Sequence, residues 1–149
     1  MVAERRINKA GLDLVKISEG LRLHAYPDPA TGGDPWTIGY GSTGKDVYRG
    51  VVITEEQAEA LLLKDLSRFE AGVTKLAPMS TDNQFAALVS FAFNLELENL
   101  KTSTLLRMHN AGDYKGAQKQ FIRWNKANGK IMPGLTTRRQ AEATLYGEP

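Results

Sequence analysis

The chain has 149 residues, a length typical of one domain with a sizeable core, and it contains no cysteine. Disulfides and thiolate metal sites are therefore excluded. The two histidines, His24 and His109, are far apart in the sequence and form no metal-binding pair motif, so we expect no metal ion. The formal net charge is only +2.

That small net charge hides an asymmetry. Residues 101–149 carry nine Lys or Arg against three Asp or Glu, a net +6, whereas residues 1–100 carry ten against fourteen, a net −4. The basic end either attracts an anionic partner or is simply a solvated surface. No apolar run follows the charged N-terminal residues, and no stretch approaches the ~18 apolar residues of a spanning helix. We therefore expect no signal peptide and no membrane insertion.

The first third of the chain predicts one helix and a small sheet. A helix is expected over residues 8–19, with Asn8 as its N-cap and Gly20 as its stop. Apolar and polar residues then alternate with the period of a half-buried strand. Three short strands are expected, at residues 21–26, 36–40 and 51–53, and the Pro- and Gly-rich residues 27–35 form the turn between the first two.

The remainder predicts helices. Capping boxes at Thr54–Gln57, Thr81–Gln84 and Thr137–Gln140 each predict a helix start. The first of these helices should end at Gly72, and the second, apolar on nearly every side, should be the buried centre. Ser103 or Thr102 and then Asp113 cap two shorter helices. The fold class predicted is therefore α+β, mostly α.

A glycine-rich segment resembles two nucleotide-binding motifs. Residues 39–45 match GxGxxG and the first seven positions of a P-loop. Both motifs need a helix that begins at the glycines, so that its N-terminus meets a phosphate, but the following residues predict strand and turn. Asp46 would also repel a phosphate. We interpret the glycines as tight β-turns rather than as a nucleotide site.

Two carboxylates and a hydroxyl indicate chemistry on a sugar. Breaking a glycosidic bond takes a general acid and a second carboxylate with a different pKa. Glu19 ends the first predicted helix, where the helix dipole and apolar neighbours disfavour ionisation, as a general acid requires. Asp28, in an open Pro-flanked loop, suits a water-activating base, and Thr37 could hold the water. From the spacing alone, a solvated surface glutamate is the competing interpretation.

At these residues the chain resembles the phage-type lysozymes, or endolysins, of glycoside hydrolase family 24. The family pattern is a Glu, eight residues, an Asp or Cys, and then a Thr in a Thr-Ile-Gly-Tyr-Gly-like strand. Glu19 and Asp28 have this spacing, and residues 37–41 match the strand. The likeness continues through the segments at residues 19–26, 84–88, 93–94, 103–106 and 134–142.

The resemblance implies a lysozyme-like fold in which a long helix joins a small antiparallel β lobe to a helical lobe. Residues 1–149 would form one domain, with the β lobe at about 20–54, the helical lobe at about 55–149, and helix 8–19 packed on the latter. The activity implied is that of an inverting muramidase. Such an enzyme cuts the β-1,4 bond between N-acetylmuramic acid and N-acetylglucosamine in peptidoglycan, during host cell lysis.

The resemblance also assigns residues and partners. Glu19, Asp28 and Thr37 would be the catalytic set. Separately, we expect Tyr26, Asn94, Arg138 and Arg139 to bind substrate, and the alternative for the two arginines is that they are ordinary surface charges in a first helical turn. No cofactor is implied. We expect a monomer that binds peptidoglycan and not nucleic acid, and that waits in the host cytoplasm until a separate protein permeabilises the membrane.

Three positions depart from the family pattern. Eight residues rather than the usual five separate Asp28 from Thr37, which makes Asp34 a rival base. Glu96 stands where the family usually has Gly, so a strained helix turn is expected there. Ser42 stands where His is common, which removes a possible ion pair. A non-catalytic module that binds peptidoglycan or a polyanion is the alternative function, and the basic C-terminal third is its support.

Overall fold

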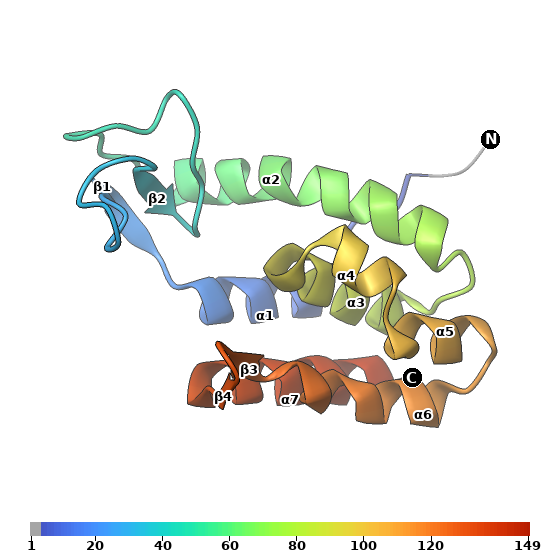
Figure 1. Cartoon of the computed structure of the whole chain (residues 1–149). Coiled ribbons are helices and arrows are strands. Elements are labelled where there is room, and N and C mark those ends of the chain that lie inside the picture. The colour runs from blue at the N-terminus through green and yellow to red at the C-terminus, as the bar shows by residue number, and fades with distance from the viewer. Residues whose placement is uncertain (1–3) are drawn as a thin grey trace. The chain divides into compact units, whose positions relative to one another are not determined.

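The computed structural model describes residues 4–149, which are mostly helical and contain two small antiparallel sheets (Figure 1). The chain forms two compact units. One comprises Glu19–Ser67, and the other comprises the residues up to Ser18 together with Arg68–Pro149. The 22-residue helix α2 (Glu55–Leu76) begins in the first of these units and ends in the second. We call them the β unit and the helical unit.

The β unit contains a two-stranded hairpin. Strand β1 (Arg22–Tyr26) pairs antiparallel with β2 (Thr37–Gly39), so the first two predicted strands are confirmed. The predicted third strand is wrong as a full strand. In residues 51–53 the Val51 carbonyl oxygen accepts a hydrogen bond from the Ala25 N–H, and the Ile53 N–H donates to the Leu23 carbonyl oxygen. Only Val52, however, forms a β-bridge. A turn from Tyr48 to Val51 directly precedes it, which leaves too few extended residues for a ladder.

Helix α2 starts as its sequence predicts but ends later. Thr54 and Gln57 make both hydrogen bonds of the capping box, at 3.1 and 2.8 Å. The helix then passes Gly72, the predicted stop, and ends at Leu76. Gly72 serves a close approach instead, because a Cβ atom there would lie 2.6 Å from the side chain of Leu97, the first residue of helix α4 (Leu97–Lys101).

Helix α3 (Asp82–Leu95) is the centre of the helical unit, as predicted. Thr81 caps it with a complete capping box, and every residue from Gln84 to Ala92 is buried. Its most extensive partner is helix α7 (Pro133–Gly147). This unit also contains α1 (Lys9–Glu19, of which Glu19 belongs to the β unit), α5 (Thr104–Asn110) and α6 (Tyr114–Gln120), which are labelled in Figure 1. A 3₁₀ turn, Phe121–Trp124, directly follows α6.

The predicted start of the last helix is wrong. Helix α7 begins at Pro133, four residues before the Thr137–Gln140 capping box. Proline suits the first helical position, because its missing N–H would have no partner there and its φ is already helical. Thr137 lies inside the helix, where its hydroxyl donates to the carbonyl oxygen of Pro133.

A second hairpin, which the sequence analysis missed, precedes α7. Strand β3 (Lys126–Ala127) pairs with β4 (Lys130–Ile131) around Asn128 and Gly129. Both turn residues have positive φ values, 52° and 78°. An Asn-Gly pair is the strongest short-range signal for such a two-residue turn, but each strand here has only two residues, too few to show alternation.

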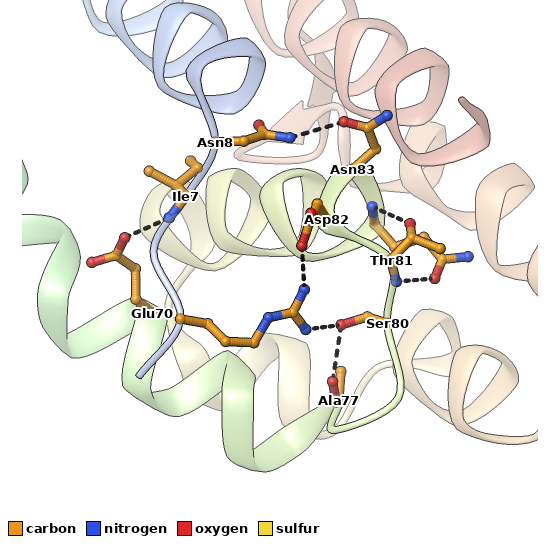
Figure 2. A network of polar contacts seen from close by, with 10 residues as sticks. Ile7, Asn8, Glu70, Ala77, Ser80, Thr81, Asp82 and Asn83 are labelled. Carbon is orange, nitrogen blue, oxygen red and sulfur yellow. Dashed lines mark hydrogen bonds and ion pairs between the residues drawn. The ribbon is translucent and has the colours of Figure 1, made fainter. Parts of the chain in front are cut away.

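The N-terminal segment is tied to the helical unit by a polar network (Figure 2). The buried backbone N–H of Ile7 donates to Glu70 Oε2 at 2.7 Å, and Asn8 Nδ2 donates to Asn83 Oδ1 at 2.9 Å. Asn8 also caps α1, since its Oδ1 accepts from the backbone of Gly11 at 2.9 Å. The predicted N-cap is confirmed, and the start of α1 is fixed to both α2 and α3.

Candidate active site

Glu19 is the last residue of α1, and its carboxylate lies against a turn that follows strand β2. A Cβ atom on Gly41 would be only 3.3 Å from Glu19 Oε1. Gly41 also has a φ of 94°, which side-chain-bearing residues rarely adopt. Glycine is therefore required twice at this position, for its backbone conformation and for the space that the half-buried carboxylate occupies.

The turn that holds Gly41 is the direct continuation of the strand that carries Thr37. Ile38 and Ser42 exchange both backbone hydrogen bonds, at 2.9 and 2.8 Å, and so close the turn. Ile38 and Ser42 are buried, whereas Thr37 is half-buried. One short segment thus supplies the surface beside Glu19 and the hydroxyl of Thr37.

Ser42 anchors this turn to helix α2. Its hydroxyl donates to Asp65 Oδ2 at 2.6 Å, and Ser42 is 2% exposed. Because Ser replaces the His that is common in the family, only the loss of an ion pair was expected here. The hydrogen bond to Asp65 instead keeps a connection between the turn and the helix, without a second formal charge.

Tyr26 and Thr37 are directly opposite each other in the hairpin. Residues opposite each other in an antiparallel pair point to the same face, with Cβ atoms about 4.5–5.5 Å apart. Asp28 follows Tyr26 by two residues. The hairpin register therefore brings Tyr26 beside Thr37 and places Asp28 just past this end of β1, while Glu19 precedes the opposite end.

Asp28 is held in a turn of its own. Its Oδ1 accepts from the backbone N–H of Ala30 at 2.9 Å, and its backbone N–H donates to Gly33 O at 2.9 Å. Asp34, the rival base, is exposed, and its backbone oxygen accepts from the Thr31 hydroxyl at 2.8 Å. The additional loop residues are therefore folded into a turn that starts at Asp28, and Asp28 keeps its position at the end of the strand.

Arg139 lies in the helical unit and is fully buried. Its Nε is 2.7 Å from Glu142 Oε1, and its Nη2 donates to Glu142 Oε2 at 3.0 Å. The Ser90 hydroxyl donates to the same carboxylate at 2.6 Å. Burial raises the pKa of the Glu142 carboxyl, and Arg139 and Arg138 oppose that shift. This placement does not support the substrate contact expected for Arg139, which belongs to an internal ion pair.

The other two expected substrate ligands also belong to the helical unit. Arg138 is 5% exposed and donates through Nη2 to the backbone oxygen of Ser90 at 3.3 Å. Asn94 is half-buried, and its Oδ1 has no hydrogen-bond partner within residues 4–149. A buried amide oxygen without a partner is costly and is a candidate acceptor for a ligand N–H.

Residues 16–142 match the sequence pattern of the phage lysozyme family. The chain belongs to this family. It is 48% identical over 141 residues to the endolysin of Bacillus phage B103, covering 94% of this chain and 53% of that protein. It is 46% identical over 145 residues to the endolysin of Acyrthosiphon pisum secondary endosymbiont phage 1, covering 94% of this chain and 97% of that protein. The chain thus spans about half the length of the Bacillus phage relative.

Solved phage lysozyme structures have the same fold. The endolysin of Escherichia coli O157:H7 phage FAHEc1 superposes with a TM-score of 0.88 at 38% identity, over 99% of this chain and 97% of that one. The predicted phage lysozyme family and the lysozyme-like α+β fold class are confirmed. The non-catalytic binding module is not favoured.

Residues 4–149 contain no group of three or more His, Asp or Glu that could hold a metal ion. Nor does any helix in that range have the length and apolar character needed to cross a membrane. Two residues near the candidate catalytic set were not found from the sequence. Asp65 gave no local signal, since it pairs with Ser42 from 23 residues away. Arg22 did give a local signal, because it lies four residues before Tyr26 in the alternating pattern of β1 and so belongs to the same face of the strand.

Proposed function

We propose that this phage lysozyme hydrolyses the β-1,4 bond between N-acetylmuramic acid and N-acetylglucosamine in bacterial peptidoglycan, and so lyses the host cell. The observation that carries the proposal is the position of the Glu19 carboxylate against Gly41, in the turn that continues from Thr37. A half-buried acid that lies against the segment carrying a hydroxyl suits attack on a glycosidic bond.

Glu19 acts as the general acid that protonates the leaving oxygen. Asp28 acts as the base that activates water on the opposite face of the sugar, and Thr37 orients that water. Because the water attacks directly, the anomeric configuration inverts. The support for Asp28 is its fixed turn at the end of β1, whereas Asp34 is exposed farther along the loop.

Tyr26 and Asn94 remain candidates for substrate binding, whereas Arg138, like Arg139, is buried and ion-paired with Glu142. Tyr26 lies opposite Thr37, and Asn94 is a half-buried amide whose oxygen has no hydrogen-bond partner within residues 4–149. We further propose that the protein acts as a monomer without a cofactor, and that it stays in the host cytoplasm until the membrane is permeabilised. Fractionation of infected cells before and after permeabilisation tests the location.

The decisive experiment is the release of reducing ends from purified peptidoglycan by Glu19→Gln. We expect a loss of roughly 10²–10⁴-fold in kcat with an unchanged melting temperature, because an amide cannot supply the proton. Glu98→Gln, at an exposed position of α4, is the matched control. Retention of more than a tenth of the activity would remove Glu19 from this role.

A paired comparison identifies the base. Asp28→Asn should be severely impaired and Asp34→Asn nearly normal, because catalytic groups must be positioned to well within ~1 Å and Asp28 is the anchored acid. The measurement is kcat on the same peptidoglycan. The opposite ranking of the two variants would assign the base to Asp34, whereas equal and mild losses would assign most of the water positioning to Thr37.

A further inference from the structure

The exposed face of the β hairpin carries an arginine that the proposed hydrolysis does not use. Arg22 is the first residue of β1, three residues after Glu19, and it is exposed. Its guanidinium carbon lies 4.6 Å from the centroid of the Tyr26 ring. This contact places Arg22 on the same face as Tyr26, and Tyr26 is directly opposite Thr37.

The Arg22 guanidinium contacts an aromatic ring, and its hydrogen-bond donors are available. Within residues 4–149 its guanidinium makes no ion pair and no hydrogen bond to another side chain, and its central carbon lies over the Tyr26 ring. Stacking on an aromatic ring restricts the rotamers of arginine and leaves the N–H donors at its edge free. Such a fork matches a carboxylate in two-point geometry.

We propose that Arg22 forms a subsite for a carboxylate of the peptidoglycan stem peptide. This inference rests on the proposed function, since it deepens the substrate class of the same hairpin. In peptidoglycan the lactyl carboxyl of a substituted muramic acid is consumed in the amide bond to the peptide, so the free carboxylates belong to the peptide. Because Arg22 and Thr37 are on one face, a glycan near Thr37 brings its attached peptide within reach of the guanidinium.

The test compares two forms of one substrate. Purified sacculi are used either intact or after carbodiimide-mediated amidation, which neutralises peptide carboxylates and leaves the glycan unchanged. On intact sacculi we expect Arg22→Ala to raise the apparent KM about tenfold with kcat within twofold, because an ion pair with charged hydrogen bonds is lost from binding. Arg22→Lys, which keeps the charge without the planar fork, should give an intermediate KM.

On amidated sacculi the wild type and Arg22→Ala should have the same KM. Arg49→Ala removes an equal charge from an exposed position of the same unit, and it should follow the wild type on both substrates. An Arg49→Ala variant that behaves like Arg22→Ala would overturn the subsite, since the effect would then be general attraction to the wall. So would an Arg22→Ala variant that remains as sensitive to amidation as the wild type.

Sedimentation with the two kinds of sacculi gives the same comparison as a Kd, with Glu19→Gln added to both the wild-type and the Arg22→Ala protein so that the sacculi are not digested. This measurement separates the two proposals, because it does not depend on bond cleavage. If the wild type releases no reducing ends, the proposed hydrolysis fails, and the difference in Kd between wild type and Arg22→Ala still decides the subsite. Equal Kd values for these two proteins on intact sacculi would refute it.

Discussion

Glu96 has a backbone conformation that its side chain disfavours. It lies between α3 and α4 with φ 82° and ψ 151°, a region that is essentially restricted to glycine and costs of order 1–3 kcal/mol for other residues. Its backbone N–H donates to Ala92 O at 2.6 Å, and its carboxylate pairs with Arg68 at 3.2 Å. Both partners of that ion pair are more than half exposed, so the pair compensates only a small part of the strain.

Glu96→Gly should therefore stabilise the protein. We expect the free energy of unfolding to rise by about 1 kcal/mol, after the greater freedom of glycine in the unfolded chain is subtracted. For a chain of this size the melting temperature should rise by roughly 2–4 °C. Glu96→Ala is the control, since it removes the pair with Arg68 and keeps the positive φ. A glycine variant no more stable than the alanine variant would contradict the argument.

The sequence was most informative about the chemical identity of single residues in the candidate site. The departure at Glu96 predicted strain, and the φ value agrees. Glu19, Asp28 and Thr37 could be selected because their chemical types and spacing are local properties of the chain. Partners distant in the sequence could not be selected. Two such contacts are the hydrogen bond of Ser42 to Asp65 and the buried group of Arg139, Glu142 and Ser90. They form only when separate elements pack together, and the periodicity within one element does not encode that packing.

His109 links three elements of the helical unit. Its Nε2 is 3.0 Å from the carbonyl oxygen of Met79, so this nitrogen donates, and its Nδ1 therefore accepts from the Tyr146 hydroxyl at 2.6 Å. The ring belongs to α5, Tyr146 to α7, and Met79 to the connection between α2 and α3. Burial lowers the pKa of His109, and the hydrogen bond to Met79 partly opposes that shift.

This contact makes stability depend on pH. An unfolded histidine takes up a proton near pH ~6.5, whereas the folded ring does so only at lower pH, so the unfolded state binds more protons in between. The contribution of the neutral His109 ring to the free energy of unfolding is therefore fully present above pH ~6.5. It falls as the pH drops below that value, by up to about 1.4 kcal/mol for each pH unit.

Urea unfolding at pH 7.5, 6.5 and 5.5 measures this dependence. His109→Gln, which cannot take up the proton, should unfold with a flatter pH profile than the wild type. His24→Gln removes an exposed histidine and should keep the wild-type profile. If the His24 variant alone flattened the profile, His109 would not be the group responsible.

Element boundaries were predictable wherever one capping residue determines them. Thr54 and Thr81 make both hydrogen bonds of their capping boxes, and α2 and α3 begin directly after them. The same pattern at Thr137 misled, because Pro133 was already a suitable first residue and the chain became helical before reaching the threonine. The helix end predicted at Gly72 was wrong for a similar reason, since glycine is needed there to leave space for the Leu97 side chain and not to end the helix.

The net charge of +6 on residues 101–149 should make the rate of wall lysis depend on salt concentration. Attraction between a basic surface and an anionic wall is screened over about 8–10 Å at physiological ionic strength. We expect lysis of permeabilised bacteria by the purified protein to slow steeply as salt increases. Turbidity measurements over a salt series test this.

Two exposed lysines of the second hairpin provide a matched variant for this prediction. Replacing both Lys126 and Lys130 with Glu should flatten the salt dependence, because their positive charges are reversed on the surface that the wall attracts. Equal wild-type rates at low and high salt would instead show that the basic excess only keeps the protein in solution.

Helix α2 belongs to both units, and this has a consequence for cooperativity. If the β unit opens, residues from Glu55 lose their packing, but the helix can fray only until it reaches turns still held in the helical unit, where Phe69 and Val73 are buried. Amide hydrogen exchange should accordingly slow along α2 from its first turn towards Phe69. The same helix would then hold turns that exchange readily, in the part that belongs to the β unit, and turns that remain protected, from Arg68 onward.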